Sequence, residues 1–359
     1  MEALKNIDRH NYKNEDVRKL IKLYTFKGKE FWYESQLAND INLIKKQLVV
    51  KNCYSLVKYF KLDISDKRLK LLLIKDSKPK NKEEQLVHNM KQVLTISANQ
   101  GHNFELITNE IVLMANKLFD NIKKVKISTS TVDYNDNLLV MQRTVSKRNE
   151  IDELFNRYQD LLASEDYEIV TLIINFYIDF INIKPLTEDN EMVALFIMNN
   201  MLLREHFDIN MYESFFEELL LHQQEFEKMT VEASYNYKDG YPRTEELTRL
   251  IVDILIKNYE KLELMLRDYQ YDNKLNKTDN IENTIYRLPQ TFTKEDIRKL
   301  HPYVSESTIN RTLKKLKEEG KINPLSTGRS ASWIRITEGP ERFNINGQLD
   351  IFEVLKNEN

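Results

Sequence analysis

A loop near the middle of the chain gathers side chains that could bind or repel an anion. It reads Lys184-Pro185-Leu186-Thr187-Glu188-Asp189-Asn190-Glu191-Met192 and separates two strongly apolar segments. A loop that holds nucleotide phosphates needs glycines, so that successive backbone N–H groups can turn inward, and a positive charge or a helix N-terminus aimed at the anion. This loop has no glycine, and its acids precede or begin the second apolar segment. We therefore expect the loop to repel phosphate.

The charged residues of the loop have two interpretations. Lys184 could bind an anion by itself, but a protonated lysine is a poor general base at neutral pH. The three acids could exclude phosphate by repulsion. They could also only stabilise the first turn of a helix, which is a common role for acids in that place.

A second group of polar side chains lies near the C-terminus. From Ser305 the chain reads SESTINRTLKKLKEEG, and the spacing of Ile309, Leu313 and Leu316 predicts a helix with these residues on its inner face. Asn and Arg can bind base edges of DNA through paired hydrogen bonds, whereas Lys and hydroxyl groups hold phosphates. The residues available for such contacts are Ser307, Thr308, Asn310, Arg311, Lys314 and Lys315. Arg329, at the tip of a predicted hairpin, could contact a minor groove or a phosphate.

The distribution of charge also favours DNA as the partner of this segment. The net charge of the whole chain is only −3, but residues 305–335 hold seven basic and three acidic residues, whereas residues 184–227 hold two basic and ten acidic ones. Positive charge clustered on one element is the electrostatic signature of a nucleic-acid-binding module. The alternative is a module that makes only protein contacts.

The end of the chain carries a short peptide of a recognisable kind. Gln348-Leu349-Asp350-Ile351-Phe352 resembles the peptide with which many bacterial proteins dock on the replicative sliding clamp, where the apolar side chains fill a pocket. The other interpretation is a hairpin within FNINGQLDIF, with Asn346-Gly347 as its turn.

Several classes of protein are disfavoured. The six histidines are scattered, and none has the spacing of a metal-binding motif; a Walker lysine, a dinucleotide fingerprint and a nucleophile elbow are also missing from the sequence. We therefore predict no metal site and no bound cofactor. The single cysteine, Cys53, excludes a disulfide framework and fits a reducing cytoplasm. The longest apolar run is shorter than the roughly 18 residues of a membrane span, so we predict a soluble, cytoplasmic protein.

The elements that must position these residues are mainly helices. Seven glycines and seven prolines in 359 residues, with 41% hydrophobic residues, predict a mainly α protein with few tight turns. Apolar residues from 169 to 183 and from 193 to 203 predict two buried helices around the loop, and a further long helix is expected from 244 to about 269. A β-hairpin is expected from Val125 and Ile127 to Leu138–Val140, around a turn at 135–137.

The same patterns predict five segments. They are an N-terminal helical region (1–85), a helical core (86–270), a polar linker (271–280), a helix, helix, turn, helix and hairpin unit (281–337), and a tail (338–359).

The segment from Phe176 to Phe207 resembles the centre of a Fic domain, where a buried helix leads into His-Pro-Phe-x-(Asp/Glu)-Gly-Asn-Gly-Arg and a second buried helix. Pro185, Glu188 and Asn190 match that motif. Lys184 replaces its catalytic histidine, Asp189 and Glu191 replace its glycines, and Met192 replaces its arginine. The glutamate of the inhibitory helix in that family is also missing, since the aligned positions are Leu56, Phe60 and Lys61.

The C-terminal unit resembles a winged helix-turn-helix, on the residues VSESTINRTLKKLKEEGKI. Together the two resemblances imply a bacterial protein with a Fic-like helical core, a hairpin flap and a DNA-binding winged helix. The degenerate motif implies a pseudoenzyme that acts as a dimeric transcription regulator on double-stranded DNA.

The alternative is an adenylyltransferase that uses ATP and Mg²⁺ to move AMP to a protein hydroxyl. It is disfavoured because the base and the phosphate-binding groups are replaced. A minor alternative is a protein that binds the sliding clamp through its tail.

Overall fold

The computed structural model describes residues 1–38, 40–136, 139–274, 277–302, 304–325 and 331–336. The chain forms two compact units, Met1–Leu266 and Arg267–Asn359. Their secondary structure is mainly helical with two small sheets, which confirms the predicted fold class.

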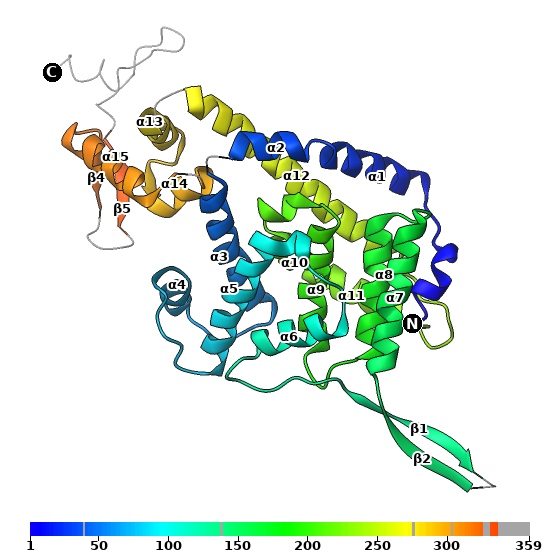
Figure 1. The fold of residues 1–359 in the computed structure, drawn as a ribbon. Coiled ribbons are helices and arrows are strands. Elements are labelled where there is room, and N and C mark those ends of the chain that lie inside the picture. The colour runs from blue at the N-terminus through cyan, green and yellow to red at the C-terminus, as the bar shows by residue number, and fades with distance from the viewer. Residues whose placement is uncertain (39, 137–138, 275–276, 303, 326–330, 337–359) are drawn as a thin grey trace, which may run out of the picture. The chain divides into compact units, whose positions relative to one another are not determined.

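Unit 1 contains most of the helices (Figure 1). In chain order they are η1 (Leu4–Arg9), α1 (Asn14–Lys27), α2 (Glu30–Leu37), α3 (Ile41–Tyr59), α4 (Asp66–Lys75), α5 (Lys82–Gln100), η2 (Gly101–Asn103), α6 (Thr108–Leu118), α7 (Arg148–Ser164), α8 (Ile169–Ile183), α9 (Asn190–Arg204), η3 (Asp208–Met211), α10 (Phe215–Leu221), α11 (Gln223–Ser234) and α12 (Glu245–Lys274), whose residues after Leu266 belong to unit 2. The predicted N-terminal region, residues 1–85, lies within this unit.

Helices α8 and α9 form the centre of unit 1, as their apolar sequences predict. Almost every side chain of both helices is buried. The carboxylate of Glu168 caps α8 by accepting hydrogen bonds from the backbone N–H groups of Val170 and Thr171, at 2.8 and 2.6 Å. Asn175, a polar residue inside α8, donates to the Thr171 carbonyl at 2.8 Å. The loop between the two helices is therefore held at both ends by rigid, buried elements.

Asp179 joins the first residues of the chain to the buried helix α8. Its carboxylate accepts hydrogen bonds from the N–H groups of Ala3 and Leu4, both at 2.9 Å, and from the Tyr237 hydroxyl at 2.7 Å. Burial raises the pKa of Asp179 even though three donors surround it. The N-terminal segment is thus part of the core.

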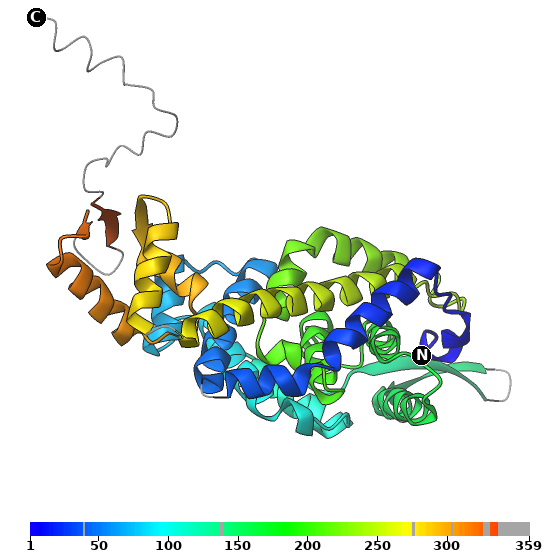
Figure 2. The same cartoon turned by 90° about the horizontal axis from the view of Figure 1, so that it is seen from above.

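Helix α1 runs beside α12 and is linked to it by ion pairs (Figure 2). Asp16 pairs with Arg249 through two hydrogen bonds, of 2.6 and 3.2 Å, and both side chains are largely buried. These bonds from Arg249 lower the pKa of Asp16. The Lys19–Asp253 pair at 2.8 Å is more exposed, and such pairs contribute little to stability.

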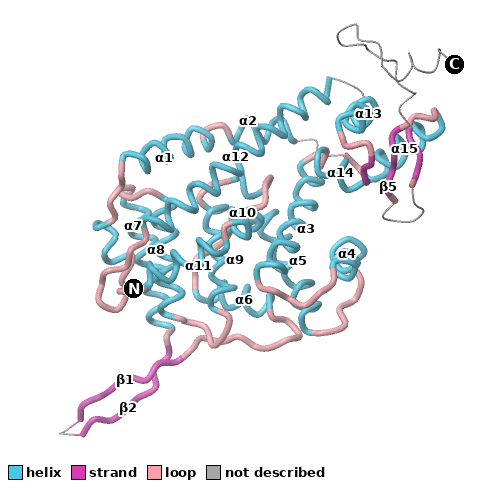
Figure 3. Tube along the Cα trace, turned by 180° about the vertical axis from the view of Figure 1, so that it is seen from behind, coloured by secondary structure: helices cyan, strands magenta, loops and turns pink. Residues whose placement is uncertain are grey.

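A hairpin of β1 (Thr129–Asp136) and β2 (Leu139–Ser146) projects from the helices of unit 1 (Figure 3). Its strands are antiparallel, with Thr129 opposite Ser146. The predicted first strand was placed too early, because Ile127 does not belong to the hairpin and forms an isolated bridge with Leu186.

Unit 2 contains three described helices and a small antiparallel sheet of strand order β3-β5-β4. Its elements are α13 (Lys277–Arg287), β3 (Thr291–Thr293), α14 (Lys294–Leu300), α15 (Glu306–Glu318), β4 (Ile322–Pro324) and β5 (Ser332–Arg335). Thr293 and Ser305 cap α14 and α15 through their hydroxyl groups, and Gly320 follows α15 with a positive φ of 74°, as their sequence positions predict. Strand β3 was not predicted.

The polar segment that we interpret as a linker, residues 271–280, is helical wherever it is described. Helix α12 continues to Lys274, and α13 begins at Lys277. The segment contains no glycine or proline to end a helix.

Within the described ranges, none of the helices has the length and apolar composition needed to cross a bilayer.

Candidate functional site

The backbone of the loop between α8 and α9 turns at two residues in the left-handed region. Lys184 follows α8 with a φ of 50°, and Asp189 precedes α9 with a φ of 53°. Glycine is the default residue in this conformation, and Asp is one of the few others that adopt it readily. The loop therefore contains a turn that suits glycine, although it has no glycine.

The amide of Asn190 closes the loop. Its Oδ1 accepts a hydrogen bond from the Leu186 N–H, and its Nδ2 donates to the Leu186 carbonyl, both at 2.9 Å. Both polar groups of the side chain therefore have backbone partners in the loop itself.

The loop is also tied to the segment that leads into the hairpin. The Ser128 N–H donates to the Pro185 carbonyl at 2.7 Å, and the Thr187 N–H donates to the Lys126 carbonyl at 2.9 Å. The loop and the base of the hairpin are thus one hydrogen-bonded assembly.

The acids of the loop pair with a lysine from outside it. The Lys123 ammonium lies 2.7 Å from the Glu188 carboxylate and also contacts that of Asp189. Burial opposes the charged form of Lys123, but hydrogen bonds to Asp189 and Glu188 outweigh it and raise the pKa of this lysine. The Asp189 side chain accepts no hydrogen bond from the N-terminal N–H groups of α9. Asp189 therefore does not cap α9 through a side-chain hydrogen bond.

The other residues of the loop differ in their exposure. Lys184 has an exposed side chain, and Met192 is buried in the core. Lys147, which lies nearby, donates to the carbonyls of Ile183 and Lys184 at 2.5 and 3.4 Å. The ammonium groups of Lys123 and Lys147 are thus bound to carboxylates and to carbonyls, respectively.

The closing role of Asn190 leads to a stability prediction. Asn190→Ala should lower the free energy of unfolding by about 1–3 kcal/mol, because the Leu186 N–H and carbonyl lose their partners in a partly buried place. Urea unfolding measures the change.

The matched control is Asn99→Ala. Asn99 is exposed, and its amide bonds only to the Thr95 carbonyl in its own helix, so the loss should stay within about 0.5 kcal/mol. Equal losses in the two variants would contradict the closing role.

On α15, the buried residues are Ile309, Thr312, Leu313 and Leu316. The opposite side exposes Ser307, Asn310, Arg311, Lys314 and Lys315, while Thr308 is half-buried. The structure thus brings the residues selected from the sequence to the outer side of one helix.

These outer residues differ in the partners they have. The hydroxyls of Ser307 and Thr308 each lie 2.8 Å from the Ser305 hydroxyl. Lys314 lies 3.8 Å from Glu318, and Lys315 lies 3.6 Å from Glu319. The side chains of Asn310 and Arg311 have no hydrogen bond or ion pair to another residue that the structure describes. Their side chains are the ones available for a partner.

Two predicted contact sites lie outside the described residues. They are Arg329 at the hairpin tip and the tail peptide Gln348, Leu349, Asp350, Ile351 and Phe352.

One cluster, formed by His102, His206 and Asp208, was not predicted from the sequence. His102 is 104 residues from His206 in the chain, so no sequence motif joins them; the pair His206-x-Asp208 was the only local signal. The fold brings them together by placing η2 beside α9.

Comparison with known proteins finds a similarity to solved structures. No family model matches the chain, and no curated protein matches it. Among solved structures, it is similar to a Fic family protein from Desulfovibrio desulfuricans G20, with a TM-score of 0.54 and 10% identity, over 92% of this chain and 98% of that chain. The chain therefore has a mainly helical fold similar to that of a Fic family protein.

Proposed function

We propose that the protein is a homodimeric DNA-binding regulator whose Fic-like core does not transfer AMP. The observation that carries the proposal is the outer side of α15, where Asn310 and Arg311 are exposed, have no described partner and stand next to two lysines.

The order of elements in unit 2 supports a winged helix. Three helices are followed by two strands, β4 and β5, and β5 pairs with both β4 and β3 in one sheet. In such a module the last helix enters the major groove. Arg311 would then bind guanine and Asn310 adenine through paired hydrogen bonds.

The lysines of α15 are suited to phosphate contacts. Their ion pairs with Glu318 and Glu319 are long, and the Lys314–Glu318 pair leaves both side chains mostly exposed. Exposed pairs within one helix are weak, so a phosphate can replace the glutamate at small cost. Arg329 would add a contact from the wing.

The DNA-binding proposal predicts a strong dependence on salt. The affinity of the whole chain for duplex DNA should fall with salt concentration, with a slope of about −0.9 for each phosphate contact. Lys315→Ala should reduce that slope by about 1 on every sequence. Fluorescence anisotropy measures both. A salt-independent affinity, or no binding at low salt, would refute the proposal.

The second half of the proposal concerns the core. Two observations support an inactive core. The ammonium groups of Lys123 and Lys147 already bind a carboxylate and a carbonyl near the loop, and Met192 is buried. Incubation of the whole chain with labelled ATP, Mg²⁺ and cell lysate should give no labelled protein. Clear transfer of label that is lost in Lys184→Ala would instead establish the transferase.

A further inference from the structure

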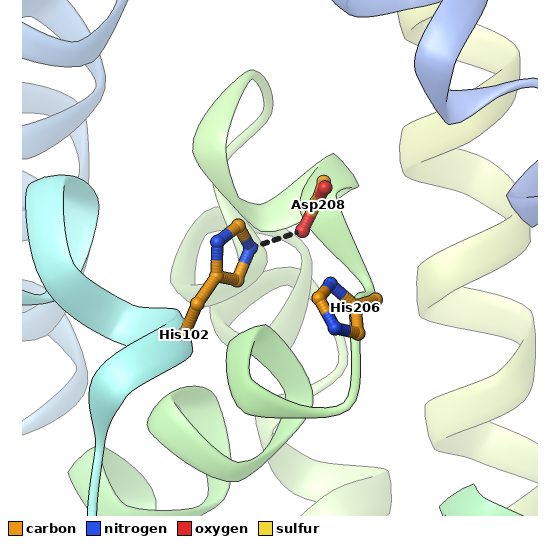
Figure 4. Close-up of side chains that lie close together, drawn as sticks. All are labelled: His102, His206 and Asp208. Atoms are coloured by element: carbon orange, nitrogen blue, oxygen red, sulfur yellow. Dashed lines mark hydrogen bonds and ion pairs between the residues drawn. The ribbon is translucent and has the colours of Figure 1, made fainter.

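Two histidines and an aspartate meet on unit 1, at the end of α9 opposite to the loop of the degenerate motif. His102 belongs to η2, His206 follows the last turn of α9, and Asp208 begins η3 (Figure 4). A helix of 15 residues is about 22 Å long, so this cluster is separate from the candidate site described above.

The three side chains bring possible ligand atoms close to one another. His102 Nε2 lies 2.6 Å from Asp208 Oδ1, and the ring centroids of His102 and His206 are 5.0 Å apart. One nitrogen or oxygen from each residue lies within 4.8 Å of the others. Imidazole nitrogen and carboxylate oxygen are ligands of zinc, and sites of three protein ligands leave a fourth position open. We propose that His102, His206 and Asp208 bind a zinc ion, with water in the fourth position.

Small side-chain movements would bring the ligand atoms to the distances that a zinc ion requires. Bonds of 2.0–2.1 Å in a tetrahedral site separate neighbouring ligand atoms by about 3.3 Å. His102 and Asp208 must therefore move apart slightly, and His206 must approach them. Both histidines are exposed, so rotation of their side chains is enough.

The backbone holds the ligands in place before the metal binds. A side chain at Gly101 would place a Cβ atom 2.7 Å from Leu203, so glycine allows η2 to approach the end of α9. The Asp208 N–H donates to Glu30 at 2.7 Å, which fixes the start of η3.

His206 stands in a conformation that favours glycine. Its φ is 58°, in the left-handed region, where glycine commonly ends a helix. A histidine in this conformation lowers the stability of the fold relative to glycine. A role as a metal ligand would explain why a histidine is present here.

The test is a calorimetric titration of the whole chain with zinc chloride, after a chelator has removed any bound metal. One zinc ion should bind per chain, and His102→Ala and His206→Ala should each weaken binding at least about tenfold. Cobalt chloride should give the intense visible spectrum of a four-coordinate ion, and both variants should lose it.

Two further variants separate a metal site from a simple hydrogen bond. Asp208→Asn keeps an oxygen that can accept from His102 but removes the charged ligand, so zinc binding should weaken while unfolding in the absence of metal stays unchanged. His222→Ala is the matched control, because His222 pairs with Glu225 at 2.8 Å and has no third ligand among the described residues; it should bind zinc like the wild type. No saturable binding by the wild type, or equal binding by all the variants, would overturn the proposal.

Discussion

Reversing two charges on α15, with Arg311→Glu and Lys314→Glu, should weaken DNA binding by on the order of 100-fold or more. Arg311 is proposed to read a base and Lys314 to hold a phosphate, so the variant loses both contacts. It also places two negative charges next to the DNA backbone. The measurement is the dissociation constant of the whole chain at one fixed, moderate salt concentration.

The control for this prediction makes the same change in net charge on unit 1. Lys5→Glu with Lys228→Glu alters two exposed lysines, and the Lys228–Glu232 pair at 3.7 Å matches the Lys314–Glu318 pair in spacing and exposure. The control should bind DNA nearly as the wild type does. Equal weakening in the two double variants would mean that net charge decides binding and that α15 has no special role.

Replacing Asp179 with alanine should lower the free energy of unfolding by about 3–5 kcal/mol. The change leaves the N–H groups of Ala3 and Leu4 and the Tyr237 hydroxyl without their acceptor in a buried place. Each buried donor without a partner costs about 1–3 kcal/mol of stability. The total loss is smaller than the sum for three donors, because the N-terminal segment with Ala3 and Leu4 would leave the core and its N–H groups would reach water.

Asp179→Asn should have a smaller effect, of about 1–3 kcal/mol. The amide oxygen can still accept from Ala3 and Tyr237, which both bond to Oδ1, while the amide nitrogen faces the Leu4 N–H. Asp160→Ala, an exposed change on α7, is the control and should stay within about 0.5 kcal/mol. Urea unfolding that ranks the two Asp179 variants in the opposite order would contradict this account of the carboxylate.

The helices of the core were predictable because their signal is local. The apolar residues from 169 to 183 give the bounds of α8, and Thr293, Ser305 and Gly320 mark helix ends by their chemistry. Strand β3 has only three residues and depends on pairing with β5, so its own sequence carries almost no signal. The helical structure of the predicted linker was not foreseen, because polar residues without glycine or proline give no sign of whether a helix continues.

In the candidate sites, too, features with a local signal could be predicted and contacts between distant residues could not. The outer residues of α15 follow from the period of one helix, which can be read directly from the sequence. The partner of Glu188 and Asp189 could not be predicted, since Lys123 is more than 60 residues away in the sequence. The contact of His102 with Asp208 spans 106 residues and depends on the close approach of Gly101 to Leu203.

The most direct test of the central proposal is selection of duplex DNA from a random pool by the purified whole chain. We expect the selected DNA to share one sequence, arranged as two inverted half-sites about one helical turn apart, as a dimer requires. The variant Asn310→Ala with Arg311→Ala should enrich no common sequence while still binding DNA weakly at low salt. A wild-type selection that yields no common sequence, or the same sequence from the double variant, would contradict the proposal that α15 reads DNA.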